Sequence, residues 1–312
     1  EPWFQKDMEI TADYAKKQAE STNKAVYIIG RTAGEDKDNA NWVGSYLLTD
    51  EEKENLKNIT EAFEDVCVVL NVSNIIDLKW IDEEQFKGHI KSVIIVWQGG
   101  MEGGNAVADA LSGKATPSGK LPDTVAYDIE DYPANDNFGN ELTNLYKEDI
   151  YVGYRYFETI PGADKKVVYP FGYGLTYGTI SYSGAKTEQE TSAVLDDVTV
   201  CTKVKNESAY PLHESVEVYV KYKNAQPGEP GFQLKGIACV ELQAGEEKEV
   251  SVTLHARDFA VITEDGGCVV RPGEYEISIG GQQPGERSRA LTGRETEILT
   301  VRKEGNEENV EY

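Results

Sequence analysis

Long apolar runs are missing from this sequence of 312 residues. The longest, at residues 66–70 and 93–97, have the length of strands and fall far short of the roughly 20 residues that a membrane span requires. A basic segment followed by an apolar one is also missing at the N-terminal end, so no signal peptide is visible. We therefore expect no membrane partner, and the sequence leaves both a cytoplasmic and a secreted location open.

Basic residues are scarce as well. Lys and Arg total 31 against 55 Asp and Glu, which gives a formal net charge of −24. An acidic surface of this kind repels phosphate backbones and anionic lipid, so we expect no nucleic-acid partner. A neutral ligand such as a sugar is compatible with this charge.

The sequence has only four cysteines and three histidines, all far apart. No two cysteines form a C-x-x-C pair, which argues against a zinc or redox motif. Cys201 and Cys239 both lie in strand-like segments, and the sequence leaves open whether they pair. A histidine metal cluster or a Ser-His-Asp triad has no support, so we expect no metal and no cofactor.

The first half of the chain alternates strand and helix patterns. Strands are predicted at residues 24–31, 66–72 and 92–97, and helices from residue 49 onward and at 102–112. Thr49, with Glu52 three residues later, has the pattern of a capping box. Because the strands are apolar throughout and are separated by helices, they predict an α/β fold, a mostly parallel open sheet with helices on both faces.

The second half has a different pattern. Tyrosine and glycine are dense at residues 146–157 and 169–177, where aromatic side chains usually pack a connection against a neighbouring surface, with sugar stacking as the alternative. From about residue 190 the apolar period becomes two, through segments at 198–204, 216–222, 250–254 and 275–279. Short alternating strands separated by turn residues predict an all-β sandwich of about seven strands.

Four stretches resemble a known family in content and in order. They are Gly-Gly-Met-Glu-Gly-Gly at 99–104, Pro-Ser-Gly-Lys-Leu-Pro at 117–122, Glu-Asp-Ile-Tyr-Val-Gly-Tyr-Arg-Tyr at 148–156 and Phe-Gly-Tyr-Gly-Leu-Thr-Tyr at 171–177. With them the chain resembles, over residues 8–300, the C-terminal α/β domain and the fibronectin type III-like domain of glycoside hydrolase family 3, the β-glucosidase family. The resemblance implies an α/β domain over residues 1–160 that is incomplete at its N-terminal side, a linker over 161–189, a fibronectin type III-like sandwich over 190–303 and a tail over 304–312.

The loop after the first predicted strand carries three acidic residues, Glu35, Asp36 and Asp38. Ligands of open α/β sheets bind beyond the carboxyl ends of the strands, so this loop lies at the functional edge. From the residues alone, a solvated Glu among many acidic residues is the simpler interpretation.

The resemblance favours a catalytic role for this loop over the interpretation as solvated acidic residues. Members of the family often carry Gly-Glu-Gly-x-Asp-Arg at the corresponding position, and its Glu is the general acid/base in many of them. Gly34, Glu35 and Asp38 match this pattern, whereas Asp36 and Asn39 depart from it. We therefore predict Glu35 as the general acid/base, with Asp36 and Asp38 as substrate-binding residues that could share its role.

A second catalytic group is missing from the sequence. The family's nucleophile is an Asp in a Ser-Asp-Trp-like segment of a (β/α)8 barrel, and neither feature occurs here. The resemblance thus implies part of a retaining β-glycosidase for a β-glucoside or β-linked oligosaccharide, inactive as an isolated chain, with a barrel domain or barrel chain as its partner. The alternative is a non-catalytic carbohydrate-binding or assembly module whose loop carboxylate is idle.

The glycine-rich stretch at residues 99–104 has a second interpretation, a phosphate cradle before a helix. It lacks the Lys-Ser/Thr of a P-loop and the spacing of a dinucleotide fingerprint. Tight packing between strand and helix is the better interpretation of these glycines.

Overall fold

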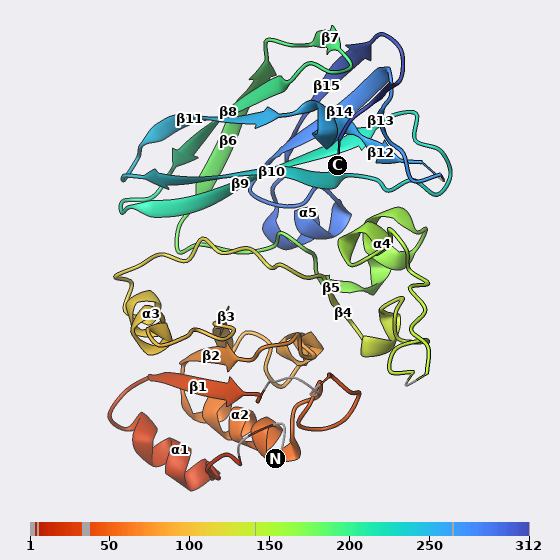
Figure 1. The fold of residues 1–312 in the computed structure, drawn as a ribbon. Coiled ribbons are helices and arrows are strands. Elements are labelled where there is room, and N and C mark those ends of the chain that lie inside the picture. Colours follow the sequence, from red (N-terminus) through yellow and green to blue (C-terminus); the bar gives the residue numbers. More distant parts are fainter. Residues whose placement is uncertain (1–3, 5, 33–37, 141, 264, 312) are drawn as a thin grey trace. The chain divides into compact units, whose positions relative to one another are not determined.

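A computed structural model describes residues 4, 6–32, 38–140, 142–263 and 265–311 of the chain (Figure 1). The chain divides into two compact units. Unit 1 is made of Glu1–Ala115 and Val125–Asn135, and unit 2 of Thr116–Thr124 and Asp136–Tyr312. The domain boundaries that were inferred from the resemblance stay predictions.

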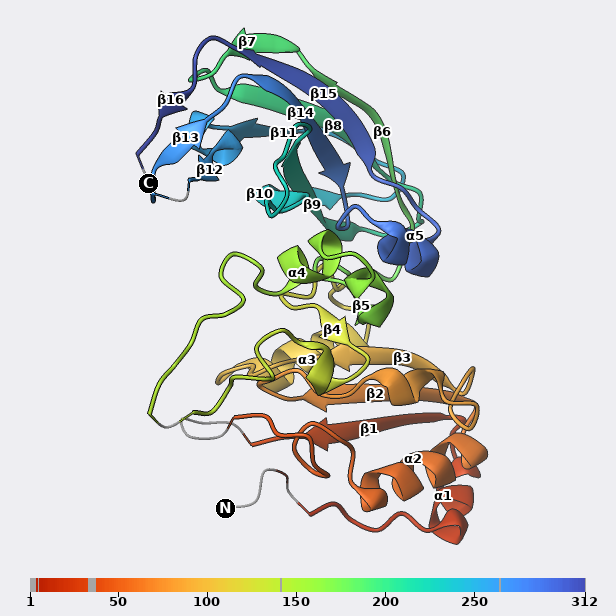
Figure 2. The same cartoon turned by 90° about the vertical axis from the view of Figure 1, so that its right-hand side faces the viewer.

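Unit 1 is built on a parallel sheet in the order β1-β2-β3 (Figure 2). Its strands are β1 (Lys24–Gly30), β2 (Asp65–Asn71) and β3 (Ile90–Ile95). The helix predicted after Thr49 is α2 (Asp50–Ala62), and the capping box of Thr49 and Glu52 is present, so both predictions are confirmed. The remaining elements of unit 1 are α1 (Ala12–Ala19), η1 (Lys79–Asp82), α3 (Gly103–Leu111), β4 (Val125–Ala126) and η2 (Ile129–Asp131).

The two faces of β1 differ in burial. Tyr27 and Ile29 are buried on the face that α2 covers, where the Asn55 amide lies 3.4 Å from the Tyr27 hydroxyl. Val26 and Ile28 point to the opposite face and are 52% and 56% exposed. One face of β1 is therefore buried beneath α2, and the apolar side chains of the other face remain half-exposed.

Unit 2 is a β-sandwich. One sheet has the order β10-β9-β14-β15-β7, and the other has the order β11-β8-β6. The strands are β6 (Ile180–Thr187), β7 (Thr191–Ala193), β8 (Val198–Asn206), β9 (Leu212–Tyr222), β10 (Gln233–Leu242), β11 (Glu247–Leu254), β14 (Gly273–Gly280) and β15 (Glu297–Glu304). All of these pairs are antiparallel except β7 with β15, so the sheets of the whole chain are mixed.

Smaller elements complete unit 2. They are α4 (Tyr154–Thr159), η3 (Ala163–Lys166), β5 (Val167–Tyr169), η4 (Ala256–Phe259), α5 (Glu286–Thr292) and the strands β12 (Val261–Ile262), β13 (Cys268–Val270) and β16 (Glu308–Asn309), which form a third small sheet.

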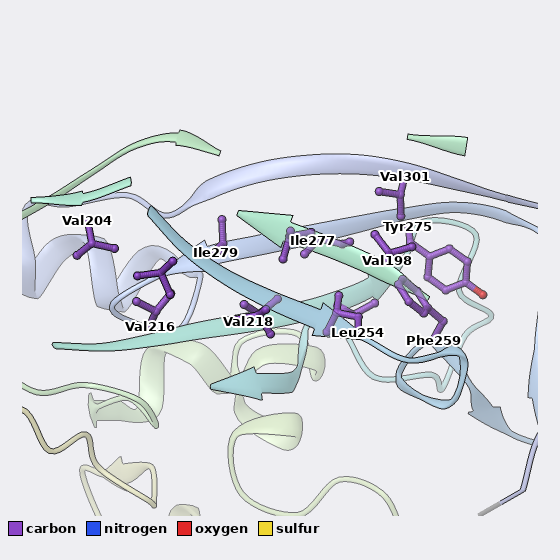
Figure 3. Close-up of a cluster of buried hydrophobic side chains, with 14 of the residues drawn as sticks. Val198, Val204, Val216, Val218, Leu254, Phe259, Tyr275, Ile277, Ile279 and Val301 are labelled. Atoms are coloured by element: carbon purple, nitrogen blue, oxygen red, sulfur yellow. The ribbon is translucent and has the colours of Figure 1, made fainter. Parts of the chain in front are cut away.

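The core of the sandwich follows from the period-two pattern. Val198, Val218 and Ile277 are fully buried between the sheets, as Figure 3 shows. Tyr275 meets Phe259 of η4 edge to face, with ring centroids 5.2 Å apart. Alternation along each strand thus sends one set of side chains into a shared apolar core, which is where most of the stabilisation of such a domain arises.

Two of the family stretches meet inside unit 2. The backbone N–H of Leu121 donates to the Tyr173 carbonyl at 2.8 Å, and that of Gly172 donates to the Leu121 carbonyl at 2.9 Å. A Cβ on Gly174 would lie 2.2 Å from the Gly119 carbonyl oxygen. Lys120 then extends to the buried Glu214 of β9, 3.4 Å away. The glycines and the lysine of these stretches are therefore explained by packing.

The tyrosine-rich connection at residues 146–157 and 169–177 packs against the β-sandwich around Tyr154, as predicted. Tyr154 of α4 stacks on Phe171 with centroids 4.6 Å apart and meets Tyr219 of β9 edge to face. The tyrosine hydroxyl also accepts the backbone N–H of Leu234 in β10 at 2.9 Å. These contacts hold α4 against the sandwich.

All four cysteines are free thiols, which answers the open question about Cys201 and Cys239. Within the described ranges no helix is long and apolar enough to cross a membrane. Over the same residues no cluster of His, Cys, Asp or Glu has the arrangement of a metal site.

Candidate functional site

The candidate site lies at the carboxyl end of β1, where the acidic loop begins. The backbone N–H of Arg31 continues the ladder to the Asn71 carbonyl of β2 at 3.1 Å. Glu35 and Asp36 lie outside the described residues, so their predicted roles stay predictions. Asp38, the third predicted site residue, is described and is exposed to solvent.

Arg31 anchors the start of the loop. Its guanidinium forms a bidentate pair with Glu52 at 2.5 and 2.8 Å, and the two side chains are only 5% and 4% exposed. It also donates to the carbonyls of Gly30, Ser45 and Leu47 at 2.9, 3.0 and 3.3 Å. Bidentate pairing fixes a planar group in orientation as well as position, so the end of β1 is held against the start of α2.

Asn39 anchors the far end of the loop. Its amide donates to the Ile75 carbonyl at 2.6 Å, in the segment that follows β2. The next backbone N–H, from Ala40, donates to the Ser45 hydroxyl at 3.1 Å. Asn39 stands where the family pattern has Arg, and in this chain it provides a local tether.

A very small cavity lies between these two anchors and has a volume of about 10 Å³. Its lining consists of Arg31, Thr32, Asn39, Ser45, Ser73, Asn74 and Ile76. A space of this size is at the limit for one water molecule, so it cannot hold a sugar ring. The described residues at this edge therefore provide anchored loop ends and polar groups but no sugar pocket.

Asp77 is an acidic residue near this edge that the sequence reasoning missed. It is 7% exposed, and its carboxylate accepts the backbone N–H of Lys79 at 2.9 Å. Burial raises the pKa of the Asp77 carboxyl above its usual range, while the hydrogen bond and the charge of Lys79 lower it. An Asp two residues before its donor is the signal of an Asx turn and could have identified this local role.

The glycines at the end of β3 are explained by close packing. A Cβ on Gly99 would lie 2.7 Å from the Cα of Gly103 at the start of α3, so no side chain fits there. Gly100 has φ +62°, and Trp97 before it is a non-glycine residue with φ +49°. This geometry favours tight strand-to-helix packing, the interpretation preferred from the sequence.

Comparison with family models places two known domains on the chain. Residues 5–177 match the glycosyl hydrolase family 3 C-terminal domain, and residues 214–283 match the fibronectin type III-like domain. Both domain types are those that the sequence resemblance indicated, and the first match extends to residue 177, beyond the predicted end of the α/β domain at residue 160.

Relatives and solved structures agree with these matches. A β-glucosidase of Ruminococcus albus is 42% identical over 289 residues, which cover 90% of this chain and 29% of the relative. The structure of a β-glucosidase from Paenibacillus barengoltzii has a TM-score of 0.86 and 42% identity, covering 96% of this chain and 32% of that one. The structure of β-glucosidase 3B from Thermotoga neapolitana in complex with α-D-glucose has a TM-score of 0.82 and 30% identity, covering 97% and 40%. The chain thus spans less than half the length of each of these proteins.

Proposed function

Because the chain belongs to glycosyl hydrolase family 3, we propose that it is part of a retaining β-glycosidase that hydrolyses terminal β-D-glucosides. In this proposal the chain contributes the general acid/base, Glu35, and the nucleophile is an Asp on a (β/α)8 barrel outside these 312 residues. The relatives' names support a glucoside as the substrate class.

The position of the acidic loop carries the proposal. It follows the carboxyl end of β1, the edge at which open α/β sheets bind ligands, and both of its ends are held, at Arg31 and Asn39. Because both ends of this short loop are fixed, a carboxylate on it can be presented to a neighbouring domain in a defined position.

The chemistry requires two carboxyl groups about 5 to 5.5 Å apart. One attacks the anomeric carbon and forms a glycosyl-enzyme, while the other protonates the departing glycosidic oxygen and then activates water. Glu35 must be protonated for the first step, so its pKa has to rise through burial or through the nearby nucleophile. The small volume at this edge, about 10 Å³, supports a site that a barrel completes.

The finer fold predictions belong to the same proposal. We infer that in the whole enzyme the α/β domain has a mostly parallel sheet with helices on both faces, ends near residue 160 and is linked to a sandwich that starts near residue 190. The half-exposed Val26 and Ile28 on one face of β1 support the view that this face is covered in the whole protein.

The test compares Glu35→Ala, Asp36→Ala and Asp38→Ala in the chain assembled with its barrel. Loss of the acid should slow aryl β-glucosides with poor leaving groups far more than those with good ones, by about 10²–10⁴-fold. Azide should restore turnover of the good substrates in Glu35→Ala, because a small anion can attack the glycosyl-enzyme without a general base.

Two other outcomes are informative. If Glu35→Ala hydrolyses both kinds of substrate at near wild-type rates and Asp36→Ala or Asp38→Ala does not, the acid/base role moves to that Asp. If all three variants are fully active, or if no barrel with a nucleophile is encoded or co-purifies, the chain is a non-catalytic carbohydrate-binding or assembly module.

A further inference from the structure

A cavity of about 360 Å³ lies within unit 2, away from the acidic loop in sequence. It is bounded by α4, β10, η4, β12 and β13, of which α4, β10, β12 and β13 are labelled in Figure 2. Its volume falls in the range of small-molecule sites, roughly 300–1,000 Å³. The mechanism proposed above does not use it, and we refer to it as the α4–β10 cavity.

Three basic side chains line the α4–β10 cavity, although the chain as a whole is strongly acidic. They are Arg155 of α4, Lys235 of β10 and Arg257 of η4. Within the described part of the chain, none of the three has an ion-pair or side-chain hydrogen-bond partner. By contrast Arg271, next to this region, is paired with Glu229 at 2.5 Å and with Glu307 at 3.4 Å.

The backbone positions two of these cations, Lys235 and Arg155, beside each other. The pairing of β10 with β9 shifts register between Leu234 and Gly236, so Lys235 is the extra residue of a β-bulge. Bulges re-aim a side chain and are common next to functional sites. The neighbouring N–H of Leu234 donates to the hydroxyl of Tyr154, which holds Arg155 of the same helix beside the bulge.

Three acidic side chains also line the cavity, Glu229, Asp258 and Glu311, of which Glu311 is exposed and the other two are engaged in other contacts. Glu229 is paired with Arg271, and Asp258 accepts the backbone N–H of His255 at 2.8 Å. Burial lowers the pKa of Lys235, Asp258 raises it, and the neighbouring Arg155 lowers it again. Among the described residues, none of these three carboxylates forms an ion pair with Arg155, Lys235 or Arg257, so the half-buried Lys235 has no direct anionic partner.

We propose that the α4–β10 cavity binds a small oxyanion, held by Arg155, Lys235 and Arg257. Two guanidinium groups and an ammonium group match the geometry of a phosphate or a carboxylate. The anion comes from one of two sources, free phosphate or the carboxylate of an acidic sugar such as glucuronate. Binding leaves the acidic loop untouched, so the proposal stands apart from the function proposed above.

The test is calorimetric titration of the full 312-residue chain at constant ionic strength, with inorganic phosphate, glucuronate and, as a neutral probe, glucose. Lys235→Gln and Arg257→Gln each remove one cation, and Arg257 is exposed, so its substitution leaves the fold intact. Lys203→Gln is the matched control, because Lys203 lies on β8 outside the cavity and loses the same charge. Melting temperatures of all variants check that each is folded.

We expect saturable binding of one oxyanion, weakened at least about tenfold in Lys235→Gln and in Arg257→Gln and unchanged in Lys203→Gln. Binding of phosphate alone identifies a free-phosphate site, and binding of glucuronate alone identifies an acidic-sugar site. The proposal is overturned if neither oxyanion binds, if glucose binds as well as glucuronate, or if folded Lys235→Gln and Arg257→Gln bind as the wild type does.

Discussion

At the scale of single residues, the ion pair of Arg31 and Glu52 is the contact that most directly supports the acidic loop. Both side chains are nearly fully buried, and Glu52 also accepts the backbone N–H of Thr49 at 2.8 Å. Glu52→Gln keeps the capping acceptor but leaves the Arg31 charge buried without its partner. We expect the variant to lose about 3–5 kcal/mol of unfolding free energy.

Urea unfolding followed by tryptophan fluorescence can measure this loss in unit 1 alone, because all four tryptophans lie in the first 115 residues. The control is Asp109→Asn, which breaks the exposed pair with Lys114 in the same unit and should leave stability nearly unchanged. Equal effects of the two substitutions would contradict a special role for the buried pair.

Gly172 is a second residue whose identity is fixed by its surroundings. It has φ +73°, and a Cβ there would lie 2.5 Å from a carboxylate oxygen of Glu217 and 2.8 Å from the hydroxyl of Tyr219. Gly184 has nearly the same φ, +72°, with no atom within 4 Å. Both Gly→Ala changes incur the strain of a left-handed conformation, about 1–2 kcal/mol, whereas Gly172→Ala also overpacks a buried site, at a further cost of about 1–3 kcal/mol.

Thermal unfolding of the two variants measures this difference directly. We expect Gly172→Ala to melt clearly below Gly184→Ala. If the two melting temperatures coincide, the side chains of Glu217 and Tyr219 move aside freely and the close approach does not explain the glycine.

At the scale of elements, the sequence was informative where the pattern is local. The capping box before α2 needs only residues three apart, and the alternation along β8 needs only its own nine residues. Lys120 could not be assigned in this way, because its partner Glu214 is 94 residues away. The β-bulge at Lys235 could not be predicted from the sequence either, because a one-residue register shift depends on how the strand pairs with its neighbour.

The candidate site, too, could be predicted from the sequence only where the pattern is local. The edge of the sheet follows from strand order, and the resemblance named Glu35 as the acid/base. The anchors were not predicted, because Arg31 and Asn39 act through carbonyls of segments that only folding brings near. The role of Glu35 itself stays a prediction that only kinetics can test.

Strand β9 carries a buried acid that couples the stability of unit 2 to pH. Burial raises the pKa of Glu217 to about 7, while Tyr219 and Lys120 lower it and Glu214 raises it further. Because the folded-state value lies above the ordinary value of 4.5, this group stabilises the fold fully below about pH 4.5, and the contribution is lost as pH rises through about 7.

We therefore expect the unfolding free energy of unit 2 to fall between about pH 5 and about pH 8. Glu217→Gln removes one titrating group and should flatten this dependence. Part of the slope should remain, because burial also raises the pKa of Glu158 to about 7. Urea unfolding followed by tyrosine signals across this pH range is the measurement, and equal slopes for wild type and variant would exclude Glu217 as a source.

At the scale of the whole molecule, the chain has one anchored acidic loop and spans 29% of the length of its Ruminococcus albus relative. Displacement at an anomeric centre with retention needs a nucleophile as well as an acid, and we assign the nucleophile to a barrel outside these residues. The purified chain alone should therefore release no aryl alcohol from an aryl β-glucoside, and addition of the barrel-bearing part should restore turnover.

The matched preparation for this experiment is the chain with Glu35→Ala, purified in the same way. If the wild-type chain and this variant turn over the substrate at the same rate, the activity comes from a contaminating enzyme, because it does not depend on the proposed acid. Turnover by the isolated wild-type chain that disappears in Glu35→Ala would contradict the divided site, since both carboxylates would then have to lie within these 312 residues. In that case Asp77, with its raised pKa near the same edge, would be the first residue to substitute in search of the second group.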